Sequence, residues 1–211
     1  MDKRQLKIIF LTVFIITFAL VAYALVFSSS KKAQLQQQSQ PQVIAQTFAE
    51  VKPSPKTTTI LAPNGKMDLV VKEEKSGDSM IDTFSVSDAS GGPQTQIYSE
   101  TLPQGTAITI PYNTFSPDNK YIFLKRTNSS GFVYFALRTD GKPIIGSEQT
   151  VDFVSLFREK YSAQYSVTDV TGWGGMTLIV LNVNKADGSL GPSFWYDVTS
   201  NSFIPLATRF N

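Results

Sequence analysis

The sequence of 211 residues contains no cysteine and no histidine. Without thiols the chain can form no disulfide bond, no iron–sulfur cluster and no thiolate nucleophile. Because imidazole is missing as well, a Cys/His zinc site, a Ser-His-Asp triad and general acid–base catalysis by histidine are excluded. We therefore expect no metal site and no cofactor, and any catalysis would have to depend on carboxylates.

Charged residues are also scarce, at 17% of the chain against the usual quarter. The net charge of +2 arises at the N-terminus, where Lys3, Arg4 and Lys7 accompany a single acid, Asp2. Removing these three from the 19 basic residues and this one from the 17 acidic residues leaves 16 of each sign. A nucleic-acid-binding domain would show a basic face, so we expect no nucleic-acid partner.

One long apolar run covers residues 8–27, without a charged residue, proline or glycine. At about 1.5 Å per residue, its length as a helix matches a bilayer core of about 30 Å. The run is longer than the apolar region of a secretory signal peptide, although Ala22-Tyr23-Ala24 resembles a cleavage site. We predict an uncleaved transmembrane helix, with a cleaved signal peptide as the alternative.

The charges that flank this run predict its orientation. Three basic residues precede the run, whereas Lys31 and Lys32 follow it. The positive-inside bias then places residues 1–7 in the cytoplasm and the rest outside it, in a single-pass protein of the cell membrane. Residues 28–56 are rich in glutamine and proline, which is typical of a polar linker with little surface to bury.

Residues 57–211 predict an extracytoplasmic β-domain, because short runs of β-branched and aromatic residues alternate with turn-forming residues. A turn followed by an apolar run occurs three times, in residues 62–71, 116–124 and 171–181. Pro63 and Pro117 are 54 positions apart, and Gly172 follows Pro117 by 55 positions. So steady a period predicts repeated structural units.

Each unit continues in the same order, with about four strands. The apolar runs hardly alternate, so we expect inner strands that are covered on both faces. The expected outer strands are residues 96–98, 143–145 and 203–206. In the third unit Gly172 and Trp173 occupy the place of the first turn.

The second unit carries a resemblance to a known family. Ser116-Pro117-Asp118-Asn119-Lys120 with its apolar run, the aromatic run 132–137 and Thr139-Asp140-Gly141 resemble one blade of a TolB-type or WD-like β-propeller. The resemblance implies an all-β, propeller-like array of about three four-stranded antiparallel units. Closed propellers typically need at least four blades, so the array would be open, completed by a partner, or packed as a sandwich.

One segment departs from the β pattern. Asp152 can cap a short inserted helix in which Phe153, Leu156, Phe157 and Tyr161 share one face, with residues 158–160 toward water. We expect this helix to pack between the second and third units, and a partner-docking helix is the alternative.

Candidate functional residues are few. The acids Asp118, Asp140 and Asp187 lie in expected turns, where their side chains serve the backbone, and we find no catalytic pair of carboxylates. Trp173 lies between glycines in an expected turn, and an exposed tryptophan is a typical binding anchor. Alternatively, its ring folds back over the core.

These features predict a non-catalytic interaction or scaffold module at the cell envelope, which engages a protein or glycan partner through the loops between units. A first alternative is a carboxylate-dependent glycan hydrolase or lyase. A second is an accessory subunit whose sheet is completed by a strand from a partner.

Overall fold

The structure of the protein is a computed structural model that describes residues 54–210. The predicted cytoplasmic tail (1–7), the transmembrane helix (8–27) and nearly all of the linker (28–56) lie outside the described residues. Within residues 54–210, no helix is both long enough and apolar enough to cross a membrane.

The described residues form three four-stranded antiparallel sheets, in each of which the strands are neighbours in chain order. Sheet 1 contains β1 (Lys56–Leu61), β2 (Met67–Ser76), β3 (Ser79–Asp88) and β4 (Thr95–Leu102). Sheet 2 contains β5 (Ala107–Thr109), β6 (Tyr121–Asn128), β7 (Gly131–Arg138) and β8 (Thr150–Asp152). Sheet 3 contains β9 (Tyr165–Trp173), β10 (Leu178–Lys185), β11 (Leu190–Asp197) and β12 (Ser202–Pro205). The predicted all-β fold of three four-stranded units is confirmed, and residues 54–210 form no closed propeller.

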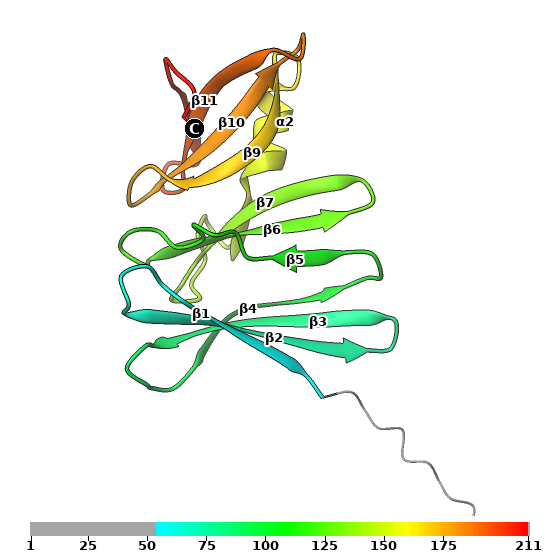
Figure 1. Ribbon diagram of the computed structural model, residues 1–211, viewed down its shortest axis with the longest axis vertical. Helices are drawn as coiled ribbons and strands as arrows, with labels where there is room; N and C mark the ends of the chain where they lie inside the picture. Colours follow the sequence, from blue (N-terminus) through cyan, green and yellow to red (C-terminus); the bar gives the residue numbers. More distant parts are fainter. Residues whose placement is uncertain (1–53, 211) are drawn as a thin grey trace, which may run out of the picture. The chain divides into compact units, whose positions relative to one another are not determined.

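Sheet 2 lies between the other two sheets, as Figure 1 shows. On β6, Ile122 and Leu124 belong to the apolar core shared with sheet 1, whereas Tyr121 and Phe123 belong to the core shared with sheet 3. Because both faces of the strand are buried, its sequence does not alternate between apolar and polar residues. The prediction of an inner strand covered on both faces is therefore confirmed for β6.

The turn before β6 follows the expected backbone chemistry. The N–H of Asn119 donates to the carbonyl of Ser116 over 2.9 Å, and Asn119 has a φ of 58°. Asparagine tolerates this left-handed conformation better than most residues do. Asp118 Oδ1 accepts hydrogen bonds from Ser116 Oγ and from the backbone N–H of Lys120, so this acid serves the turn.

The predicted helix is α2 (Phe153–Tyr161), and the N–H of Ser155 donates to Asp152 Oδ1 over 2.9 Å as an N-cap bond. Phe153 stacks on Tyr196 of sheet 3 with 5.1 Å between ring centroids, so the helix is a packing element beside sheets 2 and 3. The prediction that residues 158–160 face water is wrong for Arg158, which is partly buried. Its long side chain reaches back to donate to the carbonyl of Phe132 over 2.9 Å.

The prediction of an outer strand at residues 143–145 in the second unit is wrong, because the outer strand β8 comprises residues 150–152. Pro143 has no N–H to donate to a sheet. Ile145 instead closes a tight turn with Glu148, around Gly146 with a φ of 56°. The apolar residues 144–145 therefore belong to a turn and not to a strand, and their side chains pack on the core.

The placement of Gly172 and Trp173 in a turn is also wrong, because both are the final residues of β9. Trp173 pairs with Ile179 and Gly172 with Val180, followed by a shift of register between Val180 and Leu181. Gly172 has a φ of 144°, which a residue with a side chain rarely adopts. This glycine thus extends the strand through an irregularity, and the turn comes after it.

Candidate functional site

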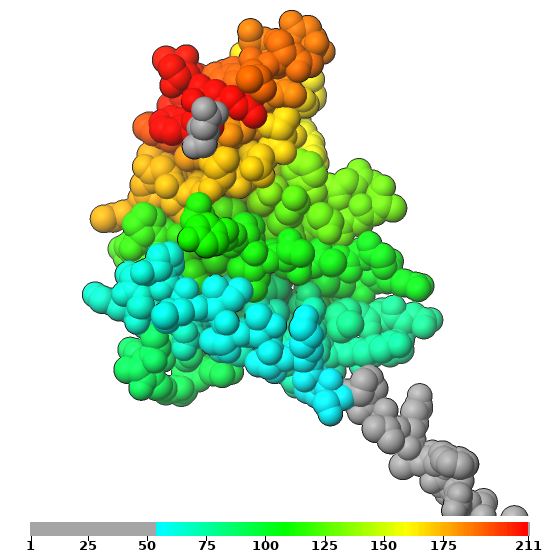
Figure 2. Space-filling view, viewed as in Figure 1, coloured from blue at the N-terminus to red at the C-terminus, as the bar shows by residue number. Residues whose placement is uncertain are grey.

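A cavity of about 820 Å³ lies where three loops come together. Each of these loops joins the first strand of a sheet to its second strand, and is called here the first connection of that sheet. These connections join β1 to β2, β5 to β6 and β9 to β10, and they lie on the same side of the domain in Figure 1. In Figure 2 they form the left edge, in cyan, green and gold from bottom to top. The lining residues are Pro63, Asn64, Asn113, Phe115, Ser116, Pro117, Asn119, Thr171, Gly172, Trp173, Gly174, Val180, Trp195 and Phe210.

Three hydrogen bonds between sheets hold the cavity walls together. Asn119 Nδ2 donates to Asn64 Oδ1 over 2.8 Å and joins sheet 2 to sheet 1. The segment before β6 is joined to β9 by Asn113 Nδ2, which donates to the carbonyl of Thr171 over 3.0 Å. Trp173 Nε1 adds a bond of 3.0 Å to the carbonyl of Thr114. The cavity is therefore a product of the packing of all three sheets.

Trp173 lies half-buried at the end of β9 and lines the cavity. Its ring packs against Phe123 and Tyr121 of sheet 2, with centroid separations of 5.9 and 6.3 Å. One part of the side chain thus covers the core while another part borders the cavity. Its role as a binding residue stays a prediction.

Two glycines, Gly172 in β9 and Gly174 directly after it, form part of the cavity wall on the sheet 3 side. A Cβ on Gly172 would lie 2.9 Å from Cβ of Asn113, and a Cβ on Gly174 would lie 2.8 Å from Nε1 of Trp195. Both separations are too short for real side-chain atoms. The absence of side chains at these positions therefore lets Asn113 and the Trp195 indole come close to the backbone of this segment.

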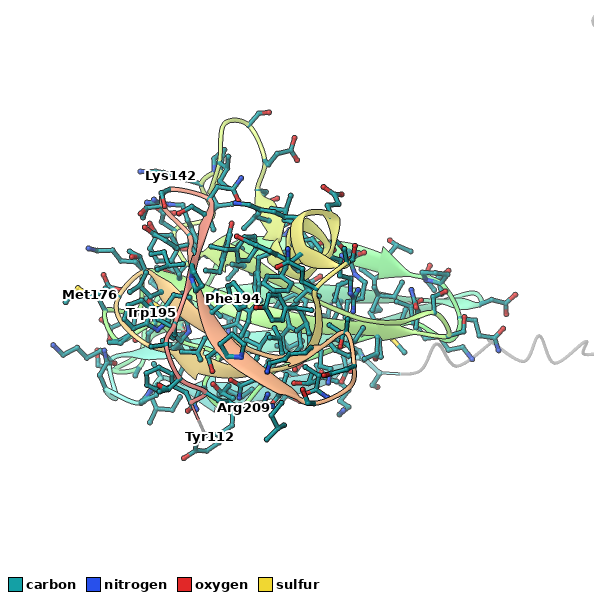
Figure 3. All side chains as sticks on the ribbon, turned by 90° about the horizontal axis from the view of Figure 1, so that it is seen from above. Tyr112, Lys142, Met176, Phe194, Trp195 and Arg209 are labelled. Carbon is teal, nitrogen blue, oxygen red and sulfur yellow. The ribbon has the colours of Figure 1, made fainter. Side chains whose placement is uncertain are left out.

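Sequence reasoning missed Trp195 as a cavity residue, although strand alternation carries the signal. Phe194 and Tyr196 belong to the core between sheets 2 and 3, so Trp195 has to point to the other face of β11. Figure 3 shows Phe194 and Trp195 on either side of the strand. The indole N–H of Trp195 is buried and finds no hydrogen-bond partner among the described residues.

Exposed apolar side chains occur on the same segments that line the cavity. Tyr112, next to the lining residue Asn113, is 97% exposed, and Met176 of the β9–β10 connection is 62% exposed. Phe210, which lines the cavity itself, is 47% exposed. Exposed aromatic anchors are typical of interaction surfaces.

No lining residue has an ionisable side chain with a pKa near neutrality. Of the predicted turn acids, Asp118 lies in the turn beside the cavity, where it accepts hydrogen bonds from Ser116 and Lys120, and the other two lie elsewhere. Asp187 accepts from the N–H and hydroxyl of Ser189, which lowers its pKa. The hydrogen bond from the Arg138 guanidinium lowers the pKa of Asp140 to about 2. Both carboxylates are thus engaged by donors of their own turns, including the backbone N–H of Lys142 for Asp140.

Among residues 54–210, Asp82 is the acid whose pKa is strongly raised, and it lies in sheet 1 among residues that do not line the cavity. It is 3% exposed and pairs in register with Glu73 on β2 and Glu100 on β4. Burial, followed by the charges of Glu73 and Glu100, raises the pKa of Asp82 to about 6. Across residues 54–210, no group of three or more acids is placed to hold a metal ion.

Comparisons with protein-family models, with curated proteins and with solved structures found no match to this chain. The geometry of the cavity therefore carries the functional argument.

Proposed function

We propose that this chain is a membrane-anchored, extracytoplasmic β-repeat protein that acts as a non-catalytic interaction module at the cell envelope. Its protein or glycan partner binds in the cavity at the shared end of the three sheets. The observation that carries the proposal is the construction of this cavity, which corresponding connections of all three sheets build from aromatic, amide and hydroxyl side chains. Its volume of about 820 Å³ lies within the usual range of ligand sites.

The lining favours binding over catalysis. A glycan hydrolase needs two carboxyl groups on opposite sides of the bond that it breaks. The cavity offers proline, asparagine, serine, threonine and aromatic side chains, none of which is a usual general acid or base at neutral pH. Amide and hydroxyl groups can, however, orient a ligand by hydrogen bonds.

The arrangement of the sheets supports a propeller-like array of three units. In each sheet the strands follow one another in chain order, and the first connection of each lies at the cavity. Blades of a propeller repeat in this way around an axis, and their loops commonly form the binding face. In this proposal, Trp173 fixes the seam between the second and third units and contributes one wall of the site.

A second candidate function, assembly with a strand from a partner, is favoured by β1. This edge strand of sheet 1 is exposed along most of its length, and residues 57–61 carry no charge. An uncharged edge strand is a template for pairing with another chain. Such assembly would use the open edge of β1.

Affinity capture from cell membranes tests the interaction module, with the tagged full-length chain as bait. The informative variant is Tyr112→Ala, because this side chain is 97% exposed and its loss leaves the core intact. Leu190→Ala is the matched control, since Leu190 is also exposed but begins β11, after the connection from β10. We expect Tyr112→Ala to reduce the amount of captured partner and Leu190→Ala to have no effect. Equal capture by all three forms would contradict binding at the cavity.

A further inference from the structure

The residues that line the cavity carry no charge, which restricts the chemistry of its ligand. The neighbouring acid Asp118 is already paired with Lys120 at 3.1 Å. None of the lining side chains is an acid or a base that could pair with an ionic group. A phosphate or carboxylate that entered would lose hydration without gaining a counter-charge, which is costly. The cavity therefore suits an uncharged ligand.

Several polar atoms of the lining are available to such a ligand. Among residues 54–210, no hydrogen bond engages Nδ2 of Asn64, Oδ1 of Asn113 or Oγ1 of Thr171. They provide one amide donor, one amide acceptor and one hydroxyl that can do both. Sugar hydroxyl groups, which also donate and accept, match this mixture better than a purely apolar ligand does.

Flat aromatic surfaces accompany these polar atoms. Two of the lining rings, Trp195 and Phe210, lie on the sheet 3 side of the cavity and are not fully buried. The C–H face of a pyranose ring is apolar and packs against a flat aromatic ring, while the hydroxyl groups at its edge reach polar side chains. Rings together with amides at one site thus match the two kinds of surface that a sugar presents.

An extended peptide fits this wall less well. A peptide that adds a strand to β9 would need unoccupied backbone groups along the open edge of that strand. The carbonyl of Thr171 already accepts a hydrogen bond from Asn113, whose side chain also blocks the space in front of Gly172. This close contact interrupts the edge of β9 at the cavity.

We infer that the cavity binds a neutral saccharide chain, an inference that rests on the proposed binding function and names its ligand class. The sugar rings stack on the aromatic side chains, and Asn64, Asn113 and Thr171 hydrogen-bond the hydroxyl groups.

The chain supplies its own probe of binding, because it has two tryptophans, Trp173 and Trp195, and both line the cavity. Tryptophan fluorescence of the full-length chain would be titrated with neutral oligosaccharides of glucose, mannose, galactose or N-acetylglucosamine, about three to six units long to suit a site of this size. The chain would be kept in a zwitterionic detergent, because glucoside and maltoside headgroups are themselves neutral sugars. Oligosaccharides of uronic acids provide the charged comparison.

We expect at least one neutral oligosaccharide to change the fluorescence in a saturable manner and its charged counterpart to bind more weakly. Asn113→Asp removes the amide donor to the carbonyl of Thr171 and sets a carboxylate against that carbonyl, so the two sides of the wall separate and sugar binding should weaken about tenfold. Thr171→Val, which removes only the hydroxyl, should weaken binding several-fold with the fold unchanged. Asn128→Asp is the matched control, because Asn128 caps the turn after β6 with its Oδ1, which aspartate also provides.

The inference is overturned if no neutral oligosaccharide changes the fluorescence at about 10 mM. Equal affinity for charged sugars, or unchanged affinity in both Asn113→Asp and Thr171→Val, would overturn it as well. If sugars fail but a protein partner is captured in a manner that depends on Tyr112, the saccharide inference falls and the proposed interaction function stands. If sugars fail and capture does not depend on Tyr112, both fall.

Discussion

Asn119 donates a hydrogen bond from its side-chain Nδ2 to Oδ1 of Asn64 over 2.8 Å. The two asparagines are 55 positions apart and occupy the turns that precede β6 and β2. The same kind of turn residue, used in two successive units, therefore joins the two sheets at the cavity wall.

This bond should contribute to stability. In Asn64→Ala, the amide of Asn119, which is 7% exposed, loses its partner, and the N–H of Lys66 loses the Asn64 carbonyl. We expect a loss of about 1–2 kcal/mol in the free energy of unfolding, measured in urea by tryptophan fluorescence. A double-mutant cycle with Asn119→Gly, which keeps the left-handed backbone, isolates the bond between the two side chains. Additive effects would show that the bond contributes nothing.

Gly174 should be needed for the shape of the cavity. In Gly174→Ala the new methyl group would lie 2.8 Å from Trp195 Nε1 and 3.3 Å from Val180, so the indole has to move. We expect a loss of about 1–3 kcal/mol in stability and a shift of the tryptophan emission spectrum. The control is Gly175→Ala, whose methyl group would make ordinary contacts with Leu178 at 3.6 Å or more. Similar spectra for the two variants would contradict the packing of Trp195 against this segment.

Asp82 should make the domain less stable as the pH rises. Its pKa is raised to about 6 in the folded state by burial, and then by Glu73 and Glu100, against 3.8 for an ordinary aspartate. The folded state therefore binds the proton more tightly, and the stabilising effect of that proton is complete below about pH 4 and lost as the pH rises through about 6. Lys56, which pairs with Glu73, lowers the pKa of Asp82 and so offsets part of the increase. The other glutamate, Glu100, is paired with Arg126 and accepts a hydrogen bond from Tyr98.

The test is Asp82→Asn, measured by urea unfolding between pH 4 and 8. The neutral amide has no proton to lose, and it can donate to either neighbouring glutamate. We expect the variant to be more stable than the wild type at pH 7 by about 1–2 kcal/mol, allowing for solvent screening, with little difference at pH 4. Asp68→Asn, on the same sheet but partly exposed, is the control. A constant difference across the pH range would contradict the role of Asp82 ionisation.

The predicted membrane topology has a separate test. In sealed membrane vesicles with the cytoplasmic side outward, we expect protease to remove an N-terminal tag and to leave a C-terminal tag intact. Addition of detergent should expose both tags. Removal of the C-terminal tag from sealed vesicles would place the β-domain on the cytoplasmic side and contradict the predicted orientation.

The sequence predicts the architecture well because its signals are local. Pro117 and Asn119 specify a turn by their own backbone preferences, and Asp152 specifies a helix start by its side chain. The prediction fails at residues 143–145, where an apolar run is a turn, because Pro143 and Gly146 outweigh hydrophobicity. It fails again at Gly172, because glycines are typical of turns but this glycine lies in β9. Its lack of a side chain leaves room for Asn113 beside the strand.

The cavity cannot be predicted from local sequence, because it depends on contacts between residues that are far apart in the chain. Asn113 and Thr171 are separated by 58 positions, and Trp173 and Thr114 by 59. Nothing in the local sequence around Asn113 identifies its partner. Trp173 could be singled out as unusual, whereas the role of Trp195 emerges only once β11 has its place in sheet 3.

Photo-crosslinking in native membranes tests the central claim, that the shared end of the three sheets is the binding site, most directly. A photoreactive phenylalanine derivative would replace Tyr112 in the full-length chain, and Leu190 in a second form. The account predicts a discrete protein or glycan adduct from position 112, absent from position 190 and reduced by Asn113→Asp. The same adducts from both positions, or adducts from position 190 alone, would contradict it.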